Sequence, residues 1–203
     1  NKVIENVRSF GFAFTSCTVP AAGHPTFEIG DDEMEFGVGI HGEPGRFREK
    51  IDYSKGSFSD DLARRIVTDL EEDLKLKKGE EVVLLINGFG GSPLQELYIL
   101  NNSVNKALEA DGIRIHRTIV GNFMTSIDMA GASITVLRVD EELKKLVDYP
   151  VNTPALTWGG AMNEQAEAAV EAMQAIAKAL NITPAAAAPA KKAAKKAVEE
   201  DDA

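Results

Sequence analysis

His41 lies in a glycine-rich stretch whose residue types suit chemistry. Gly39, Gly42 and Gly45 surround it, and glycines let the backbone turn tightly and let another molecule approach closely. An imidazole can act as a nucleophile or as a base near neutral pH. The spacing therefore indicates a presented, reactive histidine, although a turn histidine that hydrogen-bonds a neighbour fits the same pattern equally well.

Three acidic residues lie close to His41 in the sequence, namely Glu33, Glu35 and Glu43. A carboxylate can orient an imidazole and fix its tautomer, and Glu43 is near enough on the turn to do so. A solvated turn acid is the commoner meaning of such a residue. We interpret Gly39, Gly42 and Glu43 as neighbours of His41 in substrate binding, with His41 as the catalytic residue.

Two other loops have residue types that can line a site. Residues 87–93 read Asn-Gly-Phe-Gly-Gly-Ser-Pro between an expected strand and an expected helix, where such a loop can cradle phosphate. The loop lacks the Gly-Lys-Ser/Thr of a P-loop, and Ser92 followed by Pro93 suits a capped helix start, so we favour the structural interpretation. Residues 125–131 form a polar cluster that either lines a site or makes a capped turn.

The remaining candidate groups predict neither a metal site nor a thiol nucleophile. Cys17 is the single cysteine and has no CxxC partner, so we expect a buried thiol and no internal disulfide, which fits a reducing cytoplasm. His24 and His116 show no metal-ligand spacing with other residues. We therefore expect no metal bound by this chain.

Composition excludes several classes of partner. The chain has 203 residues, of which 44% are hydrophobic, and its net charge is -10. This acidic balance argues against a general affinity for nucleic acid or for anionic membranes. The sequence has no apolar run near the roughly 20 residues that span a bilayer, and we expect no signal peptide.

Hydrophobic periodicity predicts an α/β layer with at least some parallel pairing, because strands and helices alternate. The expected strands are 10–15, 26–29, 35–40, 82–86, 113–120 and 134–139. Helices are expected from an N-cap at Ser59 to Leu74, over 94–110 and over 141–147, and the segment 43–57 is expected to be a loop.

The composition changes after Trp158, where alanine becomes the dominant residue. An amphipathic helix is expected within 159–182 because its apolar residues recur at helical spacing. Residues 183–203 mix alanine, lysine blocks and a final acidic run, and we expect a disordered tail there. The structural domain is therefore expected to span 1–158.

Several segments together resemble the substrate-binding subunit of dihydroxyacetone kinases. They are residues 16–23 (SCTVPAAG), 33–45 (EMEFGVGIHGEPG), 93–98 (PLQELY), 125–131 (TSIDMAG) and 153–158 (TPALTW). The resemblance covers residues 1–158, and its most specific part is Gly-Ile-His-Gly-Glu-Pro-Gly. It implies a two-layer α/β domain with a mixed β-sheet covered by helices, a DhaK- or DegV-like second domain.

The resemblance also implies a role for His41. In that family the matching histidine attacks the ketone carbon of dihydroxyacetone, and the covalent hemiaminal holds the ketose while a terminal hydroxyl receives phosphate. Glycerol has no carbonyl and cannot form this adduct. The implied function is the substrate-binding component of a glycerone kinase. The implied alternative is a non-catalytic relative that binds dihydroxyacetone and acts as co-activator of a transcription regulator.

The same resemblance implies partners, because only the second half of that subunit is matched. The first half carries a Gly-Gly-Gly-Ser-Gly-His-Glu-Pro motif and an aspartate general base, which either another chain supplies or which was removed. ATP, or ADP in a phosphoenolpyruvate relay, is implied with magnesium on a separate nucleotide-binding subunit, so this chain itself binds no cofactor. A cytoplasmic homodimer is expected.

Overall fold

The computed structural model describes residues 1–41, 45–52, 54, 56, 58–159 and 172. The chain divides into two compact units, Asn1–Asp148 and Tyr149–Ala203. The second unit contains an antiparallel pair, β7 (Val151–Asn152) and β8 (Thr157–Trp158), and the Trp158 indole donates a hydrogen bond to the Tyr149 carbonyl at 3.0 Å. The expected helix within 159–182 and the expected tail over 183–203 lie outside the described residues, apart from Gly159 and Ala172.

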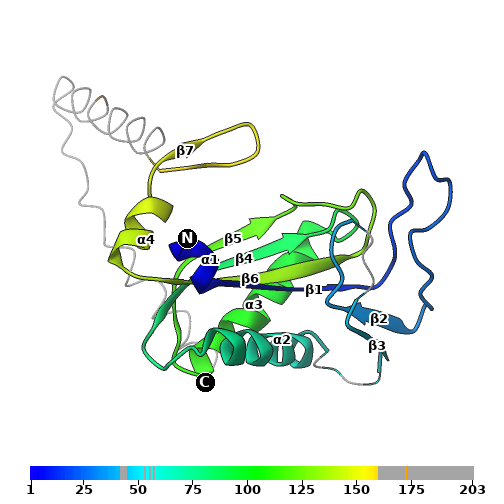
Figure 1. Ribbon diagram of the computed structural model, residues 1–203, viewed down its shortest axis with the longest axis horizontal. Helices are drawn as coiled ribbons and strands as arrows, with labels where there is room; N and C mark the ends of the chain where they lie inside the picture. Colours follow the sequence, from blue (N-terminus) through cyan, green and yellow to red (C-terminus); the bar gives the residue numbers. More distant parts are fainter. Residues whose placement is uncertain (42–44, 53, 55, 57, 160–171, 173–203) are drawn as a thin grey trace, which may run out of the picture. The chain divides into compact units, whose positions relative to one another are not determined.

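The first unit is built on a six-stranded mixed sheet in the order β3-β2-β1-β6-β4-β5 (Figure 1). Its strands are β1 (Val7–Ala13), β2 (Glu33–Phe36), β3 (Phe47–Lys50), β4 (Glu81–Gly88), β5 (Arg114–Gly121) and β6 (Gly131–Val139). The β4–β5 pair is parallel, and the other neighbours in this sheet are antiparallel. This confirms the predicted α/β class and its mixed sheet.

Two long helices cover one face of the sheet, α2 (Phe58–Leu74) and α3 (Leu94–Ala110) (Figure 1). The apolar run of β4 explains why, since Val82, Leu84 and Ile86 point to this face and are fully buried. They share one core with apolar residues of both helices, such as Ile66 and Val104. Burial of these side chains stabilises the packing of the helices on the sheet. A strand that is covered on both faces needs no alternation of apolar and polar residues.

The other face of the sheet carries two smaller apolar clusters. One is formed by Val83 and Val139 with Leu143 of α4 (Glu141–Val147). The other lies where β1 ends and consists of Ala13, Cys17, Val38, Phe89 and Met129, and we call it the loop cluster. Cys17 is 2% exposed, which confirms the predicted buried thiol.

Strand directions bring several loops to one edge of the sheet. Ala13 at the end of β1 pairs with Gly131 at the start of β6, and Asn87 near the end of β4 pairs with Gly121 at the end of β5. The loops 14–32, 89–93 and 122–130 therefore meet at this edge, which we call the loop edge. The short helix α1 (Lys2–Asn6) precedes β1 and is at the opposite edge.

The structure corrects four local predictions. Residues 26–29 form no strand, and the strand expected over 35–40 ends at Phe36 because Gly37 adopts φ +77°. The segment expected to be a loop contains β3, which pairs with β2. Helix α2 begins at Phe58, so Ser59 is inside it, where its hydroxyl hydrogen-bonds Ser103 Oγ at 3.0 Å. Helices α3 and α4 are confirmed at their predicted bounds.

Candidate functional site

The segment 37–41 leaves the sheet after β2 and lies against β1. Gly37 makes this turn with a positive φ, and its N–H donates to the Gly11 carbonyl at 2.7 Å. His41 therefore does not directly follow a strand, whereas the sequence predicted a strand over 35–40 that leads into it. It is at the end of a segment that passes over the sheet face opposite to α2 and α3.

Alternate side chains of this segment anchor it to the sheet. Val38 is 3% exposed and belongs to the loop cluster, and the half-buried Ile40 packs against the same cluster. His41 is exposed. The apolar side chains thus hold the segment against the sheet while His41 itself is exposed.

The chain returns to the sheet at Gly45 and Arg46. The Arg46 N–H donates to the Phe36 carbonyl at 2.6 Å, and the Gly45 N–H donates to Glu35 Oε1 at 2.9 Å. Glu35 is a buried acid, and its Oε2 accepts a hydrogen bond from Arg48 Nε at 2.7 Å. The hydrogen bond that Arg48 donates to Glu35 is the leading reason why the pKa of Arg48 is raised.

The other predicted site residues differ in their surroundings. Gly39 is half-buried in the segment before His41, while Gly42 and Glu43 lie outside the described residues. Glu33 accepts the Gly30 N–H at 2.9 Å. Of the two nearby acids that the structure describes, Glu35 is hydrogen-bonded to Gly45, where the chain returns to the sheet, a role that its sequence position did not indicate.

Loop 122–130 is held at the loop edge by a buried amide. Asn87 is 1% exposed, and its Oδ1 accepts the N–H groups of Phe123 and Met124, both at 2.9 Å. Its Nδ2 donates to the Met124 carbonyl at 2.8 Å. One side chain thus satisfies three backbone groups, and the last residue but one of β4 fixes the path of the loop after β5.

Loops 89–93 and 122–130 are also hydrogen-bonded to each other. The Gly91 N–H donates to the Met129 carbonyl at 2.9 Å, and the Phe89 N–H donates to the Gly131 carbonyl at 3.1 Å. These N–H groups are therefore used within the protein and do not form an open phosphate cradle, in agreement with the structural interpretation. Ser92 does not cap α3, whose N-cap is Pro93, and its hydroxyl instead exchanges two 2.9 Å hydrogen bonds with Gly131.

The polar cluster 125–131 also contacts the loop that follows β1. Asp128 Oδ1 accepts the Thr18 N–H at 3.0 Å, and Thr15 Oγ1 accepts the Ala130 N–H at 2.8 Å. Met129 itself is fully buried in the loop cluster beneath Val38 and Ile40. Phe89 and Met129, one from each of these two loops, thus belong to the loop cluster against which the His41 segment packs.

Gly11 is a residue of this site that sequence reasoning missed. A Cβ atom at this position would lie 2.5 Å from the Val38 carbonyl oxygen and 3.0 Å from the Phe89 ring. Only glycine lets the His41 segment approach β1 this closely. An isolated glycine within a strand pattern is the signal that could have indicated it.

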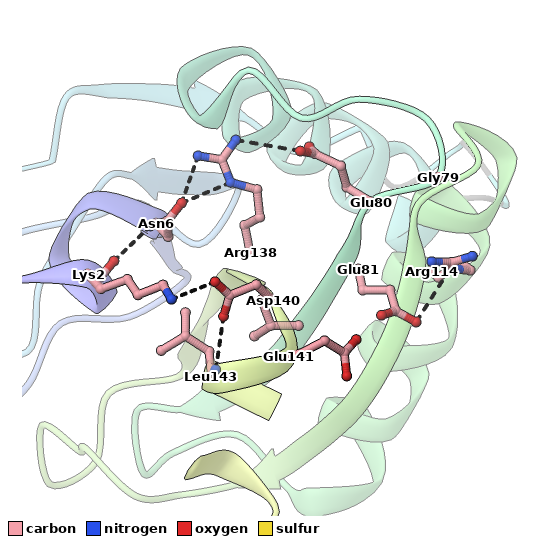
Figure 2. A pocket seen from close by; sticks show the side chains of 11 residues that line it. Lys2, Asn6, Gly79, Glu80, Glu81, Arg114, Arg138, Asp140, Glu141 and Leu143 are labelled. Carbon is pink, nitrogen blue, oxygen red and sulfur yellow. Dashed lines mark hydrogen bonds and ion pairs between the residues drawn. The ribbon is translucent and has the colours of Figure 1, made fainter. Parts of the chain in front are cut away.

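A separate cavity of about 450 Å³ lies at the opposite edge of the sheet (Figure 2). Its charged side chains are paired with one another, as Figure 2 shows for Lys2 with Asp140 and for Arg138 with Glu80. Lys2 binds Asp140 at 2.5 Å, and Asp140 also accepts the Leu143 N–H at the start of α4. This network joins α1, β6 and α4, and it contains none of the residues that the sequence singled out.

Within the described residues, no group of three or more His, Cys, Asp or Glu side chains could hold a metal ion. The helices in that part of the chain are all too short or too polar to cross a membrane.

The model of the Dak1 domain family matches residues 1–155. A relative from Listeria innocua, the dihydroxyacetone-binding subunit DhaK of PTS-dependent dihydroxyacetone kinase 1, is 45% identical over 155 residues, which cover 76% of this chain and 46% of that protein. The corresponding subunit of the PEP-dependent kinase of Escherichia coli is 39% identical, with coverage of 74% and 48%. The chain thus spans about half the length of these relatives.

A solved structure, the dihydroxyacetone kinase operon co-activator Dha-DhaQ, is similar in fold and sequence. It superposes with a TM-score of 0.64 at 32% identity, and the match covers 71% of this chain and 44% of that one. The likeness therefore extends both to kinase subunits and to a co-activator.

Proposed function

The chain belongs to the Dak1 domain family, and on that premise we propose that it is a substrate-binding component of a dihydroxyacetone (glycerone) kinase that holds its ketose covalently on His41. One observation carries the proposal. The imidazole is exposed at the end of a segment whose preceding apolar side chains, Val38 and Ile40, anchor it to the loop cluster. A nucleophile needs this combination of access and fixed position.

The proposed chemistry is the addition of imidazole to a ketone. A ring nitrogen of neutral His41 forms a bond to the carbonyl carbon, and the π electron pair moves to the oxygen, which takes up a proton. The other ring nitrogen loses its proton, so the product is a neutral hemiaminal and no oxidant or reductant is needed. The terminal hydroxyl groups of the ketose stay free for phosphoryl transfer, whereas glycerol, lacking a carbonyl, is not held.

The proposed component acts with groups that lie outside the matched half of its relatives. Because the chain spans about half of its relatives, the groups that would bind the ketose hydroxyls and act as general base belong to the half that it does not match. The phosphoryl donor, ATP or ADP with magnesium, is proposed to be held by a nucleotide-binding partner subunit. A cytoplasmic homodimer remains our expectation for the assembly.

The adduct is best observed by carbon-13 NMR of dihydroxyacetone labelled at its ketone carbon. We expect a protein-bound signal that moves from the ketone region to the region of tetrahedral carbon, and a mass gain of one ketose by intact mass spectrometry under mild conditions. His41→Ala should abolish both changes, and His24→Ala, a change at another exposed histidine, should leave them intact. Equal signals from wild type and His41→Ala would exclude the covalent proposal.

A second candidate function is ketose binding without catalysis, as in a co-activator. The similarity to the Dha-DhaQ co-activator, at 32% identity, supports this second candidate. Both candidates require the adduct, so the adduct does not separate them. The assay combines the chain with a polypeptide that supplies the unmatched half, a nucleotide-binding subunit and ATP or a phosphoenolpyruvate relay. Phosphorylation of dihydroxyacetone in this mixture supports the kinase component, while adduct formation without any transfer supports the co-activator.

A further inference from the structure

Glu35 occupies an unusual position for an acidic residue. It is 7% exposed, and carboxylates are seldom buried unless their oxygens are paired. In the sheet it pairs with Ala13 on one side and with Arg48 on the other. Ala13 belongs to the loop cluster together with Val38, so Glu35 lies on the sheet face that the His41 segment covers.

Both oxygens of Glu35 are committed to groups that close the base of the His41 segment. Oε1 accepts the Gly45 N–H at 2.9 Å, and Oε2 accepts Arg48 Nε at 2.7 Å. A hydrogen bond to an ionised acceptor is about twice as strong as one between neutral groups. An apolar residue at this position of β2 would avoid the cost of removing a charge from water. What the carboxylate provides in its place is the pair of hydrogen bonds to Gly45 and Arg48.

The ends of the segment fit one another closely. A Cβ atom on Gly45 would overlap the Phe36 carbonyl oxygen and would lie 2.7 Å from Glu35 Cγ. A Cβ atom on Gly37 would lie 2.8 Å from Arg46 Cγ. The point at which the chain leaves the sheet and the point at which it returns are therefore in direct contact, and the Glu35 side chain is hydrogen-bonded to the returning chain at Gly45.

We propose that Glu35 is a positioning residue, whose carboxylate clamps the base of the segment that carries His41 and thereby sets where the imidazole is presented. This inference rests on the proposed function of His41, because the position matters to the reaction only if that imidazole is the nucleophile. A misplacement of the reacting groups by about 1 Å can slow a reaction by roughly 100-fold. A residue that does not touch the substrate can therefore control the rate if it fixes the position of the nucleophile.

The clamp itself is tested without any ketose, by amide hydrogen exchange of the full chain measured by NMR. In Glu35→Ala the Gly45 amide should exchange at least about tenfold faster than in wild type, since its acceptor is gone. Glu35→Gln keeps a carbonyl oxygen for the Gly45 N–H and should restore much of the protection. Asp32→Asn, which breaks the exposed 2.7 Å ion pair with Lys50 at the same hairpin, should leave Gly45 unchanged.

The positioning role is then tested by the rate of adduct formation with labelled dihydroxyacetone at a temperature at which every variant is folded. We expect a fall of about tenfold or more in Glu35→Ala, partial rescue in Glu35→Gln and the wild-type rate in Asp32→Asn. A purely structural residue would lower the melting temperature in both Glu35 variants and leave the rate per folded molecule unchanged.

The outcomes separate this inference from the function on which it rests. If the Gly45 amide exchanges as slowly in Glu35→Ala as in wild type, or if the adduct rate is unchanged, the inference is wrong. If wild type forms no adduct while His41 is intact, the proposed function fails and the positioning role fails with it. The exchange result then still shows whether Glu35 holds the base of the segment.

Discussion

The carbonyl oxygen of Val38 lies 2.5 Å from the place that a Cβ atom would occupy on Gly11. The same glycine accepts a hydrogen bond from the Gly37 N–H at 2.7 Å. The backbone of β1 and the backbone of the His41 segment are therefore in direct contact, with no side chain between them.

Gly11→Ala should displace the His41 segment. Its Cβ would overlap the Val38 carbonyl oxygen, a backbone atom that cannot rotate away. We expect a loss of about 1–3 kcal/mol in the free energy of unfolding, measured by denaturant titration, and a reduced yield of the ketose adduct. Gly56→Ala is the control, since a Cβ there meets none of the described residues within 4 Å, and an equal loss in both variants would contradict the prediction.

Asn87→Ala should destabilise the loop edge. The change removes one buried amide that serves three backbone groups of Phe123 and Met124. Leaving such groups without partners is expected to lower the free energy of unfolding by about 3 kcal/mol, again measured by denaturant titration. Asn102→Ala changes an exposed asparagine on α3 and should be close to neutral, so a comparable loss there would argue against this account.

Arg65→Lys should weaken the attachment of the β2–β3 hairpin to α2. The guanidinium lies 4.6 Å from the centre of the Phe36 ring and 4.8 Å from that of Phe47, and it binds Glu49 through two nitrogens. Lysine cannot reproduce the planar fork, and we expect a loss of about 1 kcal/mol by thermal or chemical unfolding.

The matched control for Arg65 is Arg114→Lys. Arg114 has a side chain that is 66% exposed and lies 3.4 Å from Glu81, and its replacement should change stability by no more than about 0.5 kcal/mol. Part of the Arg65 effect should disappear at high salt, because ion pairs near the surface are screened. If the loss of stability in Arg65→Lys does not depend on salt, the whole effect comes from the contact of the guanidinium with the two phenylalanine rings.

Glu71 should make stability depend on pH. Burial, and next the charge of Asp111, raise the pKa of Glu71 from 4.5 to about 7. Its Oε1 is buried, and the described residues offer it no hydrogen-bond donor, while Arg64 is bound to Asp111. An acid whose pKa is higher in the folded state binds its proton more tightly when folded, so its contribution to stability falls as the pH rises from 4.5 towards 7.

Glu71→Gln removes this dependence. At pH about 8 the variant should be more stable than wild type by about 1 kcal/mol, a rise of roughly 2–4 °C in Tm, and near pH 4 the two should be alike. Thermal unfolding followed by circular dichroism across this range measures the difference. Glu72→Gln, at the next position of α2, should show no such divergence, and parallel curves for wild type and Glu71→Gln would contradict the assignment.

Parts of the fold were readable from the sequence because their causes are local. Helices α3 and α4 occur at their predicted bounds, since apolar spacing and end signals such as Gly112 operate within a few residues. The apolar run at 82–86 predicted β4 correctly, and the lack of a CxxC partner predicted the buried Cys17. The glycines around His41 predicted an accessible imidazole, and His41 is exposed.

Other parts could not be read in this way because their causes lie far apart in the chain. β3 has the weakly apolar sequence Phe-Arg-Glu-Lys and becomes a strand by pairing with β2. The strand before His41 ends at Phe36 because Gly37 turns toward Gly11, 26 positions earlier. No local pattern distinguishes Glu35, whose partners are Gly45 and Arg48, from the exposed acids near it.

The sequence alone thus indicated an exposed histidine at position 41, the helices over 94–110 and 141–147, and an α/β layer of strands and helices. These properties follow from residue chemistry and from periodicity over a few turns of chain. Tertiary structure decided how the histidine is held, through contact of the His41 segment with Gly11, through the loop cluster beneath it and through Glu35 at its base. Such contacts depend on strand register and on the close approach of backbones, and these exist only once the sheet has formed.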